Sequence, residues 1–334
     1  MMEMPNTTEE YQEYEYYPEE SPDGSQSLMC SPIDINKFAK NFLPPFYYII
    51  FITSIIGNGV VVLVIYKFEK LTTVTNLFLL NLVASNIIFT FTLPFQAVYH
   101  SDQWIFGEAL CKLVNSAHYF GFYSSVLFLT LMTFDRYLAV VHCVVASKKR
   151  RSCYALALSS AVWSISLLAS LDSFIHFTVK EYPKYGLMCE DSSDLKWKVF
   201  SLYKQFVLFF IFPLTVFVYC YFRITLTVLA TRMVGKHRTV RLIFVIVLMF
   251  FAFWSPHNII RMINENQDPQ QCDDRLSYAE YVTGNVAHLY FCINPVFYTF
   301  LGRKFQNHVR GVLMNQGSCL TSHMTVSGSS RSLA

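Results

Sequence analysis

The stretch FYYIIFITSIIGNGVVVLVI, from Phe46 to Ile65, contains no charged residue. Its length is that of an α-helix that crosses the hydrocarbon core of a bilayer. Six further stretches are also free of Asp, Glu, Lys and Arg and of similar length: Leu77–Tyr99, Leu113–Phe134, Tyr154–Leu171, Phe206–Phe222, Leu242–Ile260 and Tyr281–Leu301. Backbone groups in lipid must be hydrogen-bonded within their own segment, so the pattern predicts an all-α membrane protein, a bundle of seven transmembrane helices.

The segments between these stretches fall into two groups of opposite charge. The loops 66–76, 135–153 and 223–241 and the tail after Leu301 carry a net charge of +14, whereas the N-terminus and the other three loops carry −11. Basic residues are retained in the cytoplasm during insertion. The charge pattern therefore predicts an extracellular N-terminus and a cytoplasmic C-terminus.

The N-terminal segment is strongly acidic. Nine Asp and Glu residues precede Lys37, the first basic residue, and no apolar core of a cleaved signal peptide is present. Low apolar content and like charge predict that the segment is disordered when alone. Asn6 begins an acceptor sequence for N-glycosylation. Four tyrosines lie among the acidic residues: Tyr11, Tyr14, Tyr16 and Tyr17.

Each predicted extracellular segment contains one cysteine, where oxidising conditions allow disulfides to persist. These cysteines are Cys30, Cys111, Cys189 and Cys272. Four cysteines allow three pairings, and the residues alone leave all three open.

Most of the spans contain polar or helix-breaking residues, which we expect to face the bundle interior because lipid does not hydrogen-bond to them. The set comprises Asn58, Asn86, Trp163, Pro213, Pro256 and Pro295. Three motifs accompany it: Asp135-Arg136-Tyr137 after span three, Phe253-Trp254-Ser255-Pro256 in span six, and Asn294-Pro295-Val296-Phe297-Tyr298 at the end of span seven.

This combination of motifs resembles the rhodopsin-like G-protein-coupled receptors from roughly Phe46 to Leu313. Thr92-Leu93-Pro94 in span two and the run Phe120–Ser125 in span three are similar to chemokine receptors within that superfamily. The runs His237–Phe244 and Leu171–Phe174 are most similar to the XC subclass, followed by the C-C receptors.

The resemblance implies a plasma-membrane receptor that binds a chemokine outside and activates a heterotrimeric G protein, of Gi type, inside. It implies arrestin binding after phosphorylation of the tail, disulfides Cys111–Cys189 and Cys30–Cys272, and sulfation of the N-terminal tyrosines. No cofactor, metal or nucleic acid is expected. The implied organisation is a ligand-capture segment at 1–40, a bundle at 41–301, an interfacial eighth helix at 302–314 and a Ser/Thr-rich tail at 315–334.

The resemblance also assigns roles to individual residues. Arg136 would pair with Asp135 at rest and be released when span six bends about Trp254 and Pro256. The other implied switch residues are Tyr137, Tyr221, Asn294, Pro295 and Tyr298. The ligand-binding candidates are the four N-terminal tyrosines together with Tyr47, Gln96, His118, Asp172 and Glu280.

Three positions depart from the family pattern. Many chemokine receptors carry Glu where this chain has Gly284 and Trp where it has Gln96, so the ligand's N-terminus must be held differently here. Most rhodopsin-like receptors carry a sodium-binding Asp where this chain has Asn86. An amide supplies hydrogen bonds but no charge, so we expect poor sodium binding.

Several other functions fit the residues less well. An amine receptor would need a carboxylate at His118, and a retinal protein would need a lysine in span seven. The spans show neither the repeats nor the charges of a transporter, and no acidic pair, metal-ligand cluster or nucleophile motif favours an enzyme. A chemokine scavenger without signalling and a peptide receptor of another subclass stay open as alternatives.

Overall fold

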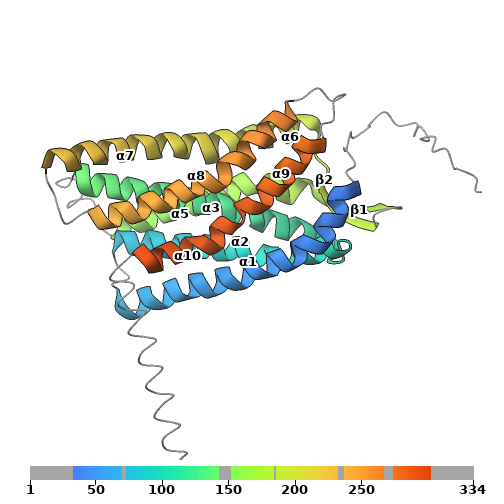
Figure 1. The fold of residues 1–334 in the computed structure, drawn as a ribbon, viewed down its shortest axis with the longest axis horizontal. Helices are drawn as coiled ribbons and strands as arrows, with labels where there is room; N and C mark the ends of the chain where they lie inside the picture. The colour runs from blue at the N-terminus through green and yellow to red at the C-terminus, as the bar shows by residue number, and fades with distance from the viewer. Residues whose placement is uncertain are drawn as a thin grey trace, which may run out of the picture.

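The computed structural model describes residues 33–69, 73–142, 152–183, 186–231, 237–266 and 274–301. Long helices dominate these residues and lie along one another, with a two-stranded hairpin at one end of the bundle (Figure 1). The elements are α1 (Ile33–Phe68), α2 (Val74–Ser101), α3 (Gly107–Val141), α5 (Ser152–His176), β1 (Phe177–Tyr182), β2 (Gly186–Asp191), α6 (Leu195–Phe206), a π-helical turn (Val207–Ile211), α7 (Phe212–Thr231), α8 (His237–Glu265), α9 (Asp274–Ala287) and α10 (Leu289–Leu301).

Six helical segments of the described chain are long and apolar enough to cross a membrane; they contain the first five predicted spans and all of the sixth except its first residue, Leu242. The seventh predicted span, Tyr281–Leu301, lies across α9 and α10, which are separated at His288. At this break the His288 N–H donates to Asn285 O and the Phe291 N–H donates to His288 O, both at 3.2 Å. These i→i−3 bonds are of the tighter 3₁₀ type, so the regular α-helical pattern of the span is interrupted at His288.

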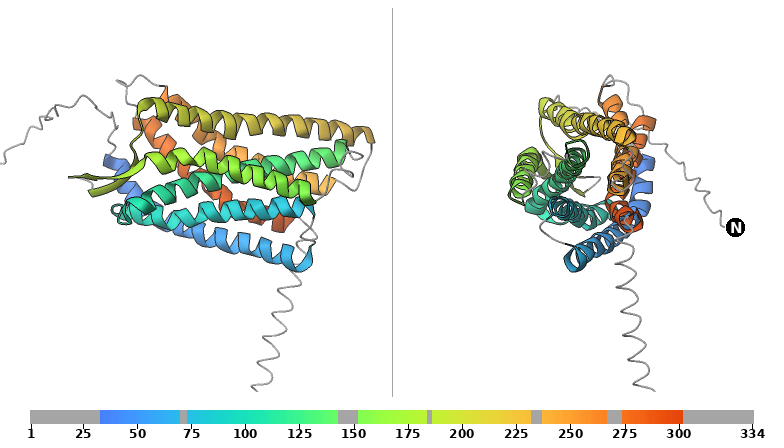
Figure 2. Two further views of the ribbon diagram at one scale, coloured as in Figure 1. Left: turned by 180° about the vertical axis from the view of Figure 1, so that it is seen from behind. Right: turned by 90° about the vertical axis from the view of Figure 1, so that its left-hand side faces the viewer.

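Helix α3 is the central element of the bundle and packs against α2, α5, α7 and α8, as the two views in Figure 2 illustrate. Its contact with α2 is unusually close at Gly121. A Cβ atom at this position would lie 2.6 Å from the backbone N of Phe89. No side chain fits there, so glycine is needed for the two helices to approach each other.

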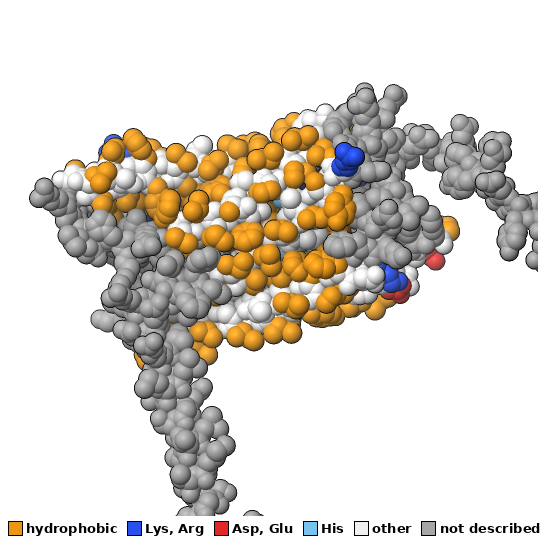
Figure 3. Space-filling model, viewed as in Figure 1, with side chains coloured by type: hydrophobic (Ala, Val, Ile, Leu, Met, Phe, Trp, Pro, Cys, Tyr) orange, Lys and Arg blue, Asp and Glu red, His pale blue; other side chains and the backbone are white. Residues whose placement is uncertain are grey.

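The outer face of the bundle is apolar. On α1, more than half of the side-chain surface of Ile49, Ile52, Ile56 and Leu63 is exposed, and these positions share one side of the helix. Hydrophobic side chains cover most of the described part of the face in Figure 3, and the charged side chains visible there lie near the ends of the helices. A soluble domain does not expose so much contiguous apolar surface, whereas a lipid-facing bundle does.

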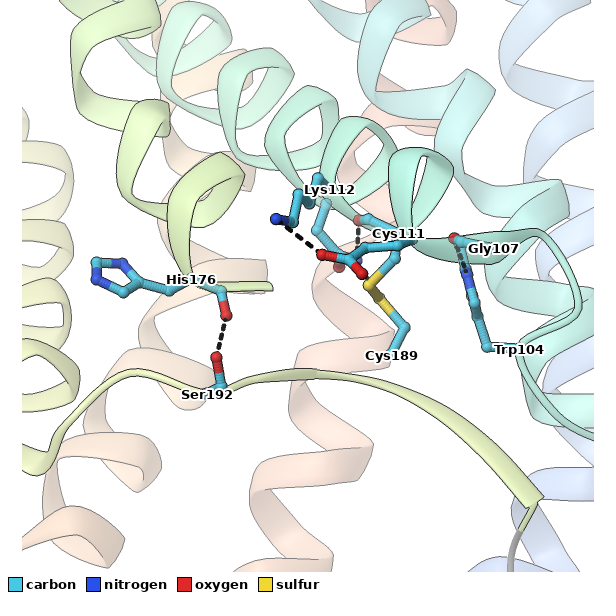
Figure 4. The surroundings of a disulfide bond; sticks show 9 residues. Trp104, Gly107, Cys111, Lys112, His176, Cys189 and Ser192 are labelled. Carbon is cyan, nitrogen blue, oxygen red and sulfur yellow. Dashed lines mark hydrogen bonds and ion pairs between the residues drawn. A yellow bond between two sulfur atoms is a disulfide. The ribbon is translucent and has the colours of Figure 1, made fainter. Parts of the chain in front are cut away.

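The hairpin β1–β2 is antiparallel and was not predicted from the sequence. Cys189 on β2 forms a disulfide with Cys111 on α3, which confirms one of the two implied pairings (Figure 4). The buried Trp104 joins the hairpin to the preceding loop, because its backbone N–H donates to Leu187 O at 2.8 Å and its indole N–H to Gly107 O at 2.8 Å. The hairpin is thus fixed to α3 by a covalent bond and by hydrogen bonds.

Charged side chains also interact across the hairpin. Glu190 on β2 accepts hydrogen bonds from the Lys180 ammonium and the Tyr182 hydroxyl of β1, both at 2.9 Å. These hydrogen bonds raise the pKa of Lys180 and of Tyr182 above their ordinary values. The Glu190 carboxylate therefore already has partners within the hairpin.

Some predicted boundaries and features differ from the structure or lie beyond its described part. Helix α1 begins at Ile33, inside the segment 1–40 that was predicted as a separate capture segment. Helix α3 continues past Asp135-Arg136-Tyr137 to Val141. Several predicted features fall outside the described residues: Asn6, the four N-terminal tyrosines, Cys30, Cys272, the interfacial helix 302–314 and the tail 315–334.

Candidate ligand cavity and cytoplasmic cluster

A cavity of about 370 Å³ lies between α1, α3, α8 and α9. It is in the half of the bundle nearer the hairpin, because its lining includes Arg261 and Asn264 from the end of α8 and Ser277 and Glu280 from the beginning of α9. Three of the predicted ligand residues line it: Tyr47, His118 and Glu280.

Tyr47 connects the cavity to α1. Its hydroxyl donates a hydrogen bond to Asn285 Oδ1 on α9, and its ring packs 5.8 Å from that of His288, measured between ring centroids. The side chain is buried in the core of the bundle. Tyr47 therefore holds α1 against α9 as well as lining the cavity.

His118 lies on the α3 wall of the cavity, where its ring packs 4.3 Å from that of Phe89 and 5.4 Å from that of His288. Its Nδ1 is 3.2 Å from the Thr92 hydroxyl, which itself donates to Phe89 O at 2.7 Å. Because the Thr92 proton is already used, a neutral His118 donates from Nδ1 and keeps Nε2 as an acceptor. His118 thus presents an imidazole at the position where an amine receptor would need a carboxylate.

Two predicted ligand residues, Asp172 and Gln96, do not line this cavity. Asp172 Oδ2 instead accepts hydrogen bonds from Lys204 Nζ at 2.6 Å and from Ser201 Oγ at 2.8 Å. Lys204 also donates to Ala169 O at 2.8 Å. The carboxylate of Asp172 therefore connects α5 to α6, a role that sequence position alone did not reveal because its partner lies 32 residues away.

Several lining residues were not predicted. They comprise His257, Arg261 and Asn264 on α8, and Tyr281, Asn285 and His288 at or near α9. Each set of three places polar side chains three or four residues apart, on one face of a helix. That spacing at the end of an apolar span is the sequence signal that could have identified them.

At the opposite end of the bundle, three side chains from α2 and α3 form a cluster. Arg136 makes an ion pair with Asp135, and its guanidinium also donates to the Thr75 hydroxyl. Thr75 in turn donates to Asp135 Oδ2 at 3.1 Å. The hydroxyl of Thr75 was not predicted, and it fixes the Arg136–Asp135 pair to α2.

Tyr137 lies beside this cluster but points to other partners. Its hydroxyl is 3.0 Å from His142 Nε2 and 3.5 Å from the Tyr219 hydroxyl on α7. Tyr221, two residues further along α7 and so on another side of that helix, packs edge-on against Phe244 of α8 with ring centroids 5.0 Å apart. These contacts join α3, α7 and α8 near the end of the bundle opposite the hairpin.

The implied switch residues of spans six and seven lie between the cavity and this cluster. Trp254 lies in α8, two residues before Pro256, and lines the floor of the cavity. Its ring centroid is 4.3 Å from that of Phe122. Asn294 is buried, and Pro295 lies so close to Gly57 that a Cβ there would be 3.0 Å from the proline Cβ. Tyr298 belongs to α10, whose last side chains are not described.

The sequence from Gly57 to Tyr298 matches a known family, described as 7 transmembrane receptor (rhodopsin family). The chain belongs to this family. The predicted seven-helix fold is thereby confirmed, and the protein is a membrane receptor of the plasma membrane and not an enzyme.

Chemokine receptors of Homo sapiens are among its relatives. The chain is 36% identical over 288 residues to the C-C chemokine receptor type 4, an alignment that covers 84% of this chain and 80% of that receptor. It is 35% identical over 322 residues to the type 1 receptor, covering 92% and 88%. It is 35% identical over 315 residues to the type 8 receptor, covering 91% and 86%.

Proposed function

We propose that this receptor binds a chemokine at the hairpin end of the bundle and activates a Gi-type G protein at the other end. We assign it to the XC subclass on the runs His237–Phe244 and Leu171–Phe174. The observation that carries the proposal is the pairing of a polar cavity at one end with the Arg136 cluster at the other. The similarity to C-C chemokine receptors supports the ligand class.

The ligand side combines two elements. The acidic N-terminal segment, with sulfated Tyr11, Tyr14, Tyr16 and Tyr17, attracts a basic chemokine over long range and speeds its encounter. The cavity then receives the ligand's N-terminus. Glycosylation of Asn6 and a second disulfide between Cys30 and Cys272 belong to this extracellular side.

The coupling side uses the ion pair of Arg136 and Asp135. In the resting state Arg136 is held by Asp135 and Thr75. When α8 bends outward at Pro256, with Trp254 responding to ligand in the cavity, Arg136 is released toward an inserted helix of the G protein. Tyr221 and Tyr298 stabilise the opened arrangement, and phosphorylation of the tail recruits arrestin.

A ligand screen tests the proposal. Cells that express the full chain are exposed to purified chemokines of the XC and C-C classes, and G-protein activation is read as a calcium or cyclic-nucleotide change. We expect a response that pertussis toxin, which inactivates Gi-type proteins, abolishes. A response to C-C chemokines alone would contradict the XC assignment, and no response to any chemokine would contradict the proposed ligand class.

A scavenger that only internalises its ligand is the main competing function. The same cells distinguish the two, because a scavenger takes up labelled chemokine without activating a G protein. An epitope tag before Met1, stained on intact cells, tests the orientation independently: we expect staining without permeabilisation.

A further inference from the structure

The walls of the cavity carry their side chains in successive layers. Helix α8 runs toward the hairpin end, so Arg261 and Asn264 lie further out than His257. Helix α9 runs inward from the same end, so Glu280 lies one helical turn outside Gly284. The outer layer thus contains Arg261, Asn264 and Glu280, and the next layer contains His257 and Gly284.

Only the outer layer is charged. Among the described residues that line the cavity, Glu280 is the only carboxylate and Arg261 the only Lys or Arg. Glu280 Oε2 accepts a hydrogen bond from Asn264 Nδ2 at 2.7 Å, whereas Oε1 forms a long ion pair with Arg261 Nε at 3.8 Å, a distance that leaves it without a hydrogen bond from that group. Arg261 Nη1 instead donates to Gln205 Oε1 at 3.1 Å. Glu280 Oε1 can therefore accept a hydrogen bond from a further cation.

In the next layer, a side chain on α9 would press against the His257 ring. A Cβ atom at Gly284 would lie 3.1 Å from Cε1 and 3.2 Å from Nδ1 of the His257 ring. Both distances are shorter than ordinary van der Waals contact, so the imidazole occupies the space that a longer side chain at position 284 would need. His257 Nδ1 is buried and has no hydrogen-bond partner among the described residues. The imidazole of His257 thus occupies the space in which an acidic side chain at position 284 would lie.

We propose that Glu280 binds the N-terminal ammonium group of the ligand and that His257 limits how deeply this terminus enters. The inference rests on the proposed chemokine function. A carboxylate at Glu280 lies about 6 Å nearer the outside than one at position 284, since the two are four residues apart on a helix. An extended peptide rises about 3.3 Å per residue, so this difference corresponds to about two residues of ligand.

The charge contact can be tested with the chemokine that gives the largest response on the wild-type receptor, prepared with a free and with an acetylated N-terminus. Acetylation removes the ammonium charge. We expect acetylation to lower the potency of the chemokine on the wild-type receptor by about tenfold or more, because loss of a hydrogen bond between charged groups weakens binding by about that factor. On Glu280→Gln the two forms should be equally potent, because the carboxylate is already lost.

Glu190→Gln is the matched control, since Glu190 is a carboxylate of the hairpin that does not line the cavity. The full acetylation effect should persist in it. An equal acetylation effect in wild type and Glu280→Gln would place the ammonium elsewhere and overturn the inference. A wild-type receptor that responds to no chemokine would instead contradict the proposed function.

The depth can be tested by moving the carboxylate inward. In the triple variant Glu280→Gln/His257→Ala/Gly284→Glu, the space left by the imidazole accommodates the new side chain. Ligands shortened or lengthened by one or two N-terminal residues are then compared on cells. We expect the most potent ligand to be about two residues longer than on wild type.

The variant Glu280→Gln/His257→Ala, without the new carboxylate, is the control and should show no such preference. An unchanged optimum in a triple variant that reaches the surface and responds would show that His257 does not set the depth. If the triple variant does not reach the surface, the acetylation comparison decides the position of the ammonium by itself.

Discussion

The polar side chains between α1, α2 and α3 differ from those around the cavity in how completely they are hydrogen-bonded. Between the three helices, Ser54 Oγ is 2.8 Å from Thr90 Oγ1, Ser125 Oγ donates to Asn86 Oδ1 at 3.0 Å, and Asn86 Nδ2 donates to Asn58 Oδ1 at 3.4 Å. All five side chains are buried. This network satisfies its members internally and fixes the relative position of the helices.

Around the cavity, several buried polar atoms have no hydrogen-bond partner among the described residues. They are Trp254 Nε1, His257 Nδ1, Tyr281 OH and His288 Nδ1. A buried polar group without a partner destabilises a protein by about 1 to 3 kcal/mol. The network between α1, α2 and α3 is thus complete in itself and maintains the fold, whereas we propose that a bound ligand supplies partners to these polar atoms around the cavity.

The largest effect is expected from a change in the first part, at the contact of α2 and α3. Gly121→Ala would place a Cβ atom 2.6 Å from the Phe89 backbone N, so the two helices must move apart. We expect loss of surface expression and of both ligand binding and signalling, measured by antibody staining and the chemokine response. Gly59→Ala is the control, because a Cβ there meets nothing within 4 Å, and it should behave like wild type. Normal expression of Gly121→Ala would show that this contact is not as rigid as the distances indicate.

The next effect separates the two ends of the bundle. Arg136→Ala removes the cation that pairs with Asp135, at the end of the bundle away from the cavity, so ligand binding should remain largely intact while G-protein activation is abolished. Ligand binding and nucleotide exchange are measured on the same membranes. Full signalling by a well-expressed Arg136→Ala receptor would remove the switch role from this residue.

A milder change at the same cluster should have the opposite sign. Thr75→Val keeps the shape of the side chain but removes the hydroxyl that interacts with both Asp135 and Arg136. Loss of one such hydrogen bond, about 1 kcal/mol, corresponds to about a fivefold shift toward the released state. We therefore expect ligand-independent signalling to rise by up to this factor, with Thr75→Ser close to wild type. Unchanged basal signalling in Thr75→Val would mean that Thr75 does not restrain Arg136.

The spans were predictable from the sequence because lipid imposes a single requirement, an uncharged helix of sufficient length, on each of them. The hairpin was not, since its register depends on pairing Phe177 with Asp191 across a turn and on the loop around Trp104. The cavity was predictable in part. Glu280 and His118 were identified, but the contact of His257 with Gly284 joins two helices and no local pattern encodes it.

The acidic N-terminal segment is proposed to attract the ligand at longer range than either of these parts. Replacing Tyr11, Tyr14, Tyr16 and Tyr17 by Phe would remove the proposed sulfate groups without changing the bundle. Exposed charges are screened within about 8 Å at physiological salt, so attraction by the sulfate groups depends on ionic strength. Without these groups, ligand binding should weaken by several-fold and depend less on ionic strength. Equilibrium binding at several salt concentrations checks this, with Tyr66→Phe, an exposed tyrosine of α1, as the control. An unchanged affinity and salt slope would make the segment a passive tail.

The smallest effect is expected from a charge introduced into the hydrogen-bonded network. Asn86 donates a hydrogen bond to Asn58 Oδ1 and accepts one from Ser125 Oγ. Because position 86 carries an amide, it offers no carboxylate to replace the water molecules around a sodium ion. We expect agonist affinity of the wild-type receptor to be nearly independent of sodium when a bulky cation keeps the ionic strength constant. In Asn86→Asp, a carboxylate oxygen would face Asn58 Oδ1 where an N–H now lies, and a cation between the two oxygens relieves their repulsion. Sodium should then stabilise the resting receptor and lower agonist affinity by a few-fold. Wild-type binding that is itself strongly sodium-sensitive would show that the amide network holds the ion without a charged ligand.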